Sequence, residues 1–227
     1  MTDRPILFSA PMVRALLAGT KTQTRRLIKP QPTFRENGSW SWEGRNGGFV
    51  GSAGTHLEAF AESARHWARI QPSDRLWVRE AWRCNGWATD VATIFYGASE
   101  GDGYTAMCEQ YPVVDRRPLR VTAGWRPSIH MPRWASRLSL TVTEVRVERL
   151  QDISEEDAIA EGCAQYSSAT KLSRPFNPDW KGIYREGYVE LWNEINGAGS
   201  WEANPWVVAY TFTVHRSNID QLATVEA

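Results

Sequence analysis

The chain has 227 residues and carries no formal net charge at pH 7. That length suits one domain with a substantial buried core. The charge balance excludes a strongly basic nucleic-acid-binding protein, so any such binding would depend on a local patch.

The three cysteines have no paired spacing, which argues against a disulfide framework and for a reduced compartment. The four histidines are scattered without metal-ligand spacing, so we expect neither a metal nor another cofactor. No apolar run is long enough to cross a bilayer, and no signal core follows the polar N-terminus. These features predict a soluble, cytoplasmic protein with no membrane partner.

The first elements in chain order are a short buried strand over 5–8 and a helix. Ser9 suits the N-cap of this helix, and Pro11 suits its first turn. Gly19 is expected to end the helix. The threonine-rich residues 20–24 favour extended backbone, because β-branched side chains prefer strands.

A glycine-rich stretch from about 30 to 72 follows, and its amino-acid composition differs from that of the rest of the chain. We interpret it as a long insertion or flexible flap that carries Trp40 and Trp42. A short helix over about 57–70 is expected to close it.

The remaining pattern mixes strands and helices. Strands are predicted over 76–82, 92–96, 139–150 and 206–214, with a bulge near Glu144. Helices are predicted over 152–162, capped by Ser154 and stopped by Gly162, and over 184–195. Irregular segments are predicted over 118–132 and 163–181, and the polar tail after Arg216 is expected to fray.

Cationic and hydroxyl side chains are concentrated between Lys21 and Arg26. Converging Arg25 and Arg26 would suit a phosphate or carboxylate. A threonine hydroxyl close to Lys21 could be a nucleophile beside its base. The alternative is a helix C-cap followed by a solvated strand, in which Lys21 interacts with helix carbonyls.

Glu161 and the tryptophans are the other candidates for function. A carboxylate in the last turn of a helix opposes the helix dipole, so Glu161 stands in a locally unfavourable place. The alternative is a solvated surface glutamate. The twelve tryptophans fit either a dense core or a surface on which bases stack.

Four segments together resemble the ASCH-domain family of the PUA-like superfamily: 17–26, 74–80, 142–162 and 204–207. Residues 129–135 are similar to the larger members encoded by bacteriophages and prophages. The resemblance implies an α+β fold, with a mostly antiparallel β-barrel flanked by helices. It implies a single domain over 1–216, with insertions at about 30–72, 84–130 and 164–182 and a polar tail over 217–227.

One branch of that family hydrolyses N4-acetylcytidine with a lysine, a threonine and a glutamate, which correspond here to Lys21, Thr24 and Glu161. The resemblance therefore implies an amidohydrolase in which Thr24 attacks the acyl carbonyl, Lys21 accepts its proton and Glu161 orients or reprotonates. Because residues 21 and 24 have opposite parity in a regular strand, this pairing requires a turn or bulge between them. The substrate-binding candidates are Arg25, Arg26, Trp77, Glu80 and Trp82, with Tyr210 as a further stacking side chain.

The expected partner is a nucleoside or a nucleic acid, RNA rather than DNA. One alternative is a non-catalytic nucleic-acid-binding module that uses Arg25, Arg26 and Lys29 with Trp40 and Trp42. A ribonuclease is another, since a second branch of the family has been described as one. A metal-dependent nuclease is the weakest alternative, because the sequence has no clear cluster of metal ligands. The sequence leaves the oligomeric state open.

Overall fold

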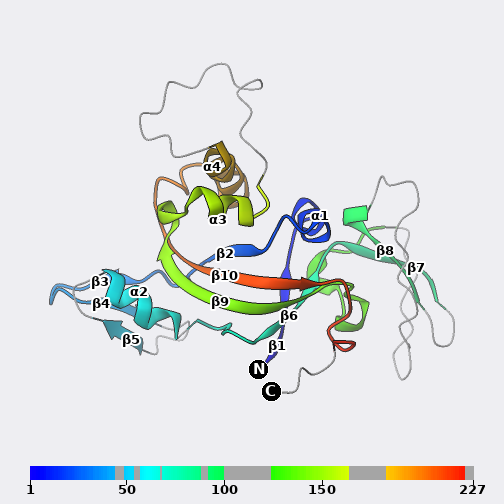
Figure 1. Ribbon diagram of the computed structural model, residues 1–227, viewed down its shortest axis with the longest axis horizontal. Coiled ribbons are helices and arrows are strands. Elements are labelled where there is room, and N and C mark those ends of the chain that lie inside the picture. The colour runs from blue at the N-terminus through cyan, green and yellow to red at the C-terminus, as the bar shows by residue number, and fades with distance from the viewer. Residues whose placement is uncertain are drawn as a thin grey trace, which may run out of the picture. The chain divides into compact units, whose positions relative to one another are not determined.

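The computed structural model describes residues 1–43, 49–53, 57–66, 68–87, 92–99, 124–163 and 183–222. These residues have an α+β fold, which confirms the predicted class. The main element is a mixed five-stranded sheet with the strand order β1-β6-β9-β10-β2 (Figure 1). Among the described strands this sheet is open, with β1 and β2 at its edges.

The strands of this sheet follow the predicted ones closely. β1 (Asp3–Leu7) runs parallel to β6 (Arg75–Arg79), and β6 is antiparallel to β9 (Ser139–Arg149). β10 (Trp206–His215) is antiparallel to β2 (Gln23–Leu27). The buried positions of β9 change parity between Val142 and Val145, where the register change near Glu144 was predicted.

The chain forms two compact units. Unit 1 contains residues 1–19, 73–141 and 213–227, and unit 2 contains residues 20–72 and 142–212. Both β9 and β10 contribute residues to each unit. The expectation of a single domain stays a prediction.

Unit 1 combines β1, β6, α1 (Ala10–Ala18) and a two-stranded ribbon of β7 (Trp82–Trp87) and β8 (Ala92–Tyr96). Three 3₁₀ turns complete it: η1 (Gly97–Ser99), η2 (Ser128–His130) and η3 (Arg133–Ala135). Its hydrophobic core includes Trp82, Cys84, Ala92, Ile94, Tyr96, Met131, Trp134 and Ala135.

Two predictions for unit 1 need correction. The single strand predicted over 76–82 is two strands, because β6 ends at Arg79 and β7 begins at Trp82. The chain also does not fray directly after Arg216. Ile219 is fully buried, and the Asn218 amide donates hydrogen bonds to the carbonyls of Arg133, Trp134 and Ser136.

Helix α1 ends where the sequence predicts. Ser9 is extended at its N-cap, although its side chain makes no capping hydrogen bond. Gly19 has φ 75°, in the left-handed region, and its N–H bonds to the carbonyls of Ala15 and Leu16. Glycine is favoured there because a β-carbon makes the left-handed region costly.

Gly19→Ala is expected to lower the free energy of unfolding by about 1 kcal/mol. The cost is backbone strain alone, since a β-carbon at residue 19 would meet no atom within 4 Å. Gly86 has equally open surroundings without a positive φ, so Gly86→Ala is the control and should change stability little. Urea unfolding of both variants checks this, and equal losses would contradict the role of φ.

Unit 2 holds β2, α2 (Leu57–Arg65), η4 (Leu150–Asp152), α3 (Glu155–Ala160) and α4 (Ile183–Asn196). It also holds a small antiparallel sheet of β3 (Thr33–Phe34), β4 (Trp40–Glu43) and β5 (Phe49–Ala53). The sequence analysis did not predict these strands, and the long insertion or flexible flap over about 30–72 stays a prediction. Trp40 anchors this sheet, with its ring centroid 5.7 Å from that of Phe60 and 5.4 Å from that of Trp206.

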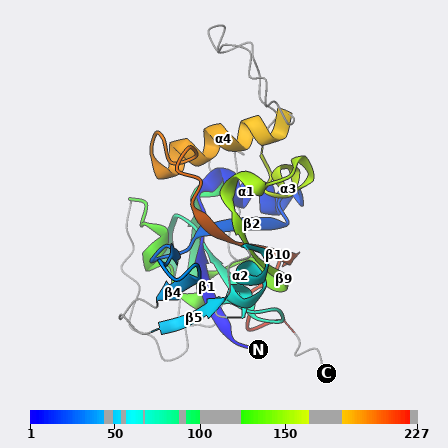
Figure 2. The same ribbon diagram turned by 90° about the vertical axis from the view of Figure 1, so that its left-hand side faces the viewer.

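Helices α3 and α4 lie side by side over their own core (Figure 2). This core contains Leu150, Ile153, Ala158, Tyr188, Val189, Trp192, Trp201 and Val207. The Ser154 hydroxyl accepts from the Asp157 N–H, and Gly162 has φ 74°, so both predicted ends of α3 are confirmed. The loop predicted over 163–181 lies almost entirely outside the described residues. Among the helices that the structure describes, none is both long and apolar enough to span a bilayer.

Candidate functional site

The site begins where the chain leaves α1 and enters β2. Lys21 forms an isolated antiparallel bridge with Glu161, the residue that caps α3. The Lys21 Nζ donates to the Glu161 backbone oxygen at 2.8 Å and to its Oε2 at 2.7 Å. The two side chains are 0% and 4% exposed. The structure therefore brings two of the three predicted catalytic residues into a buried ion pair.

Arg25 lies at the centre of the same cluster, with its guanidinium surrounded by three carboxylates. It contacts Glu148 at 2.7 Å, Asp157 at 2.6 Å and Glu161 Oε1 at 3.3 Å. It also donates to the Gln23 amide oxygen at 2.5 Å. Its side chain is fully buried, so its N–H donors bond to groups of the protein itself and are not exposed to a phosphate. The contacts do not favour the predicted substrate-binding role of Arg25.

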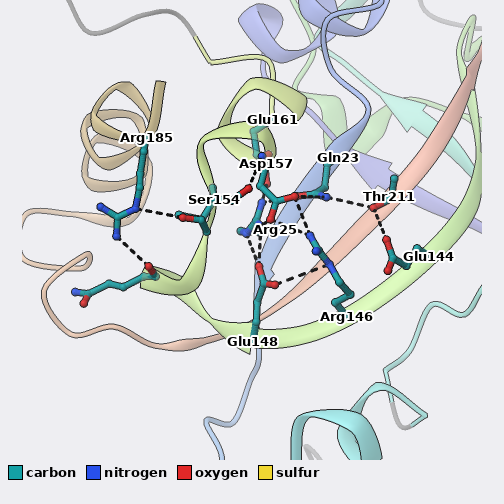
Figure 3. A network of polar contacts seen from close by, with 12 residues as sticks. Gln23, Arg25, Glu144, Arg146, Glu148, Ser154, Asp157, Glu161, Arg185 and Thr211 are labelled. Atoms are coloured by element: carbon teal, nitrogen blue, oxygen red, sulfur yellow. Dashed lines mark hydrogen bonds and ion pairs between the residues drawn. The ribbon is translucent and has the colours of Figure 1, made fainter. Parts of the chain in front are cut away.

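A chain of polar contacts extends the cluster along the sheet (Figure 3). The Gln23 amide donates to Asp157 at 3.1 Å and to Thr211 at 3.2 Å, and the Thr211 hydroxyl donates to Glu144 at 3.4 Å. Arg146 donates to both Asp157 oxygens at 2.9 Å. Strands β2, β9 and β10 and helix α3 are thus joined by side chains that all belong to unit 2.

The ion pairs at the centre of this cluster join equal numbers of opposite charges, and Glu144 is attached to them through the Thr211 hydroxyl. Three cations (Lys21, Arg25, Arg146) face three carboxylates (Glu148, Asp157, Glu161). Burial by itself raises the pKa of Asp157, but the nearby Arg25 and Arg146 outweigh it and leave that pKa below its ordinary value. Burial raises the pKa of Glu148, which Arg25 and Arg146 offset only in part.

Two further ionisable groups lie in the electrostatic environment of Glu161. Burial raises the pKa of the Cys163 thiol to about 12, and the carboxylate of Glu161 adds to the shift. Burial also raises the pKa of Tyr188 well above its ordinary value, with Glu161 again contributing. Both groups are therefore protonated at neutral pH, which argues against Cys163 as a nucleophile.

Thr24 occupies a different position from Lys21. The side chains of Gln23 and Arg25 point to α3, so the strand's alternation directs the Thr24 side chain to the opposite face. Thr24 is 1% exposed and pairs with Tyr210 on β10. Among the described contacts, its hydroxyl makes no hydrogen bond to Lys21 or Glu161. The place of Thr24 beside Lys21 and Glu161 therefore stays a prediction.

The chain does change partners between Lys21 and Thr24. The Thr22 N–H donates to the Ala160 carbonyl beside α3, while its carbonyl accepts from the Phe212 N–H of β10. Regular pairing with β10 starts at Gln23. Arg26 follows Thr24 on the opposite face and is half-buried, and burial lowers its pKa.

The other predicted substrate-binding residues belong to unit 1. Trp77 is 7% exposed, with the Arg79 guanidinium 4.5 Å from its ring centroid. Both carboxylate oxygens of Glu80 accept from Arg137, at 2.8 and 2.9 Å. Trp82 is 1% exposed and belongs to the hydrophobic core of unit 1. Each of the three is thus packed or paired inside its own unit.

A cavity of about 320 Å³ belongs to unit 2, and it shares Glu144 with the polar network. Its lining consists of Arg65, His66, Gln71, Pro72, Thr143, Glu144 and Val145. No group of three or more His, Cys, Asp or Glu side chains in the described part of the chain could hold a metal ion.

Sequence reasoning missed Gln23, Arg146, Glu148 and Asp157, which form the polar surroundings of Arg25. One signal was available, since Lys21, Gln23 and Arg25 alternate and therefore share one face of an extended segment. Arg146 and Glu148 alternate on β9 in the same way. Asp157 precedes Glu161 by one helical turn, which places both on one face of α3. In comparisons of the chain with family models, with curated proteins and with solved structures, nothing matches.

Proposed function

We propose that the protein is an amidohydrolase that removes the acyl group from an N4-acylated cytosine nucleoside. We also propose that it is a member of the ASCH family, with the five-stranded sheet as the core of that family's barrel. The observation that carries the proposal is the buried contact between Lys21 and Glu161. A lysine and a carboxylate held 2.7 Å apart away from water form a pair that can exchange a proton.

The reaction requires a nucleophile at the acyl carbon and a proton for the departing N4 nitrogen. In the proposed mechanism, the Lys21 ammonium first passes a proton to the Glu161 carboxylate. The neutral Lys21 amine then accepts the proton of the nucleophile, and the protonated Glu161 gives its proton to the leaving amine. The Thr24 hydroxyl is assigned as the nucleophile, giving an acyl ester that water then hydrolyses to the free acid. This assignment requires the change of partners at Thr22 to bring the Thr24 hydroxyl and the Lys21 amine together, because Thr24 alternates with Gln23 and Arg25 on β2.

The contacts support this function over the binding module. That alternative relies on Arg25, Arg26 and Lys29 together with Trp40 and Trp42, and Lys29 is exposed. Arg25 has its donors engaged by carboxylates, Trp42 is 9% exposed, and Trp40 packs against Phe60 and Trp206. A nucleic-acid surface needs several exposed cations and exposed rings. Arg25 and Trp42 supply neither, which leaves Lys29 as the exposed cation of the set.

Incubation of the protein with N4-acetylcytidine is expected to yield cytidine and acetate, separated by chromatography. Thr24→Val should lower kcat by about 100-fold, because it removes the nucleophile while conserving shape. Thr22→Val is the matched control at an exposed neighbouring threonine and should leave kcat unchanged. An unchanged kcat in Thr24→Val would reassign the nucleophile to water.

The same experiment separates the alternatives. Hydrolysis of a neutral nucleoside should depend little on salt. The affinity for a nucleic acid falls steeply with added salt, because binding to the phosphates releases condensed counterions. No turnover, together with salt-sensitive RNA binding, would favour the binding module. Fragmentation of RNA would favour the ribonuclease.

A further inference from the structure

Arg25 contacts both the paired glutamate and the helix that carries it. Asp157 and Glu161 are four residues apart, so they share one face of α3, and Arg25 bonds to both. Its third carboxylate partner, Glu148, belongs to β9. One guanidinium therefore fixes the start and the end of α3 against two strands.

The Glu161 carboxylate is held from two sides. Its Oε2 accepts from Lys21 and its Oε1 from Arg25, so neither oxygen can rotate away without losing a charged partner in a buried place. The planar fork of arginine can bond to several carboxylates at once, whereas the compact ammonium of a lysine acts as a point charge. This position therefore needs the planar geometry of arginine as well as its positive charge.

Arg146 provides a comparison within the same cluster. It bonds to Asp157 and lies 3.9 Å from Glu148, so it shares two of the carboxylates that Arg25 contacts. None of its ion pairs includes Glu161. The two arginines thus differ in their contact with Glu161 and in burial, since the Arg146 side chain is 37% exposed.

We propose that Arg25 is a positioning residue, which holds the Glu161 carboxylate in the orientation needed for proton exchange with Lys21. This inference rests on the proposed amidohydrolase function. In it, Arg25 acts through Glu161 and does not touch the substrate.

The test compares two double variants, each of which removes one arginine and neutralises Glu148. Arg25→Met with Glu148→Gln leaves two cations and two carboxylates and removes the support of Glu161. Arg146→Met with Glu148→Gln leaves the same charge balance and keeps that support. For N4-acetylcytidine, we expect the Arg25 pair to lower kcat about tenfold or more with KM changed less than about twofold. The Arg146 pair should keep kcat within about twofold of the parent.

Thermal unfolding of both double variants separates positioning from stability. Equal losses of kcat in the two, or a loss that follows Tm across the set, would overturn the proposal. Arg25→Lys adds a graded test, since it keeps the charge but loses the fork. Its kcat should be lowered, as that of the Arg25 double variant is. Full activity of Arg25→Lys would also overturn the proposal.

A readout without catalysis distinguishes failure of this inference from failure of the proposed function. The lysines of the chain are Lys21, Lys29, Lys171 and Lys181, so ¹⁵N-lysine NMR gives few ammonium signals. The protected signal that Lys21→Met removes should persist in the Arg146 double variant and broaden by exchange in the Arg25 double variant. A parent without turnover but with this NMR pattern would reject the hydrolase and retain the positioning. An identical Lys21 signal in both double variants would reject the positioning itself.

Discussion

Lys21→Met is expected to lower kcat for N4-acetylcytidine by about 1,000-fold, the largest effect that we predict for one substitution. The variant removes the group that accepts the proton of the nucleophile, and general-base removal commonly costs that much. It also leaves the Glu161 carboxylate, 4% exposed, with Arg25 at 3.3 Å and the nearby charge of Arg26 as its cationic neighbours. We therefore expect a loss of about 3 kcal/mol in the free energy of unfolding as well.

A second variant separates these two effects. In Lys21→Met with Glu161→Leu, both charges of the pair are absent, and apolar side chains of similar size fill the space. Replacing a buried ion pair in this way is often neutral for stability. We expect most of the stability to return, because Arg25 keeps its ion pairs with Glu148 and Asp157. Turnover should stay lost. Recovery of turnover with stability would show that Lys21 serves the fold alone.

The sequence was informative about positions that depend on local rules. Ser154 and Gly162 delimit α3 because a hydroxyl caps a helix N-terminus and glycine tolerates a left-handed φ. These two residues also place Glu161 at the end of α3. The expectation that Glu161 and Lys21 act together came from the family resemblance, because nothing local to either residue indicates that they meet.

The partners of Arg25 could not be predicted, since they come from β9 and α3, more than a hundred residues further along the chain. A strand pattern shows which residues share a face, but not what packs on that face. For this reason Arg25 and Arg26 were interpreted as one basic patch, although adjacent strand residues point to opposite faces. Strands β3 and β4 were missed for a related reason, because glycine-rich sequence masks strands whose stability comes from tertiary packing of Trp40.

Arg25→Met alone is expected to lower the free energy of unfolding at pH 7 by about 3–5 kcal/mol. The variant removes the buried cation that Glu148, Asp157 and Glu161 share, and Arg146 and Lys21 remain to balance three carboxylates. Arg146→Met is the control, and its half-exposed side chain should contribute about 1 kcal/mol or less. Urea unfolding at pH 7 measures both, and equal losses would contradict the central place of Arg25.

The pH dependence of this loss follows from the two shifted carboxyl groups. The lowered pKa of Asp157 contributes stability above its unfolded value of about 3.9, and that stability is lost as the pH falls through the folded pKa. Without Arg25 this contribution shrinks. The raised pKa of Glu148 has the opposite sign, because its ionisation costs stability near neutrality and protonation removes the cost. Without Arg25 that cost grows, so the deficit of Arg25→Met relative to the parent should be largest at pH 7 and smaller at pH 5. A deficit that does not change between pH 7 and pH 5 would mean that Arg25 stabilises the fold by packing and not through these carboxylates.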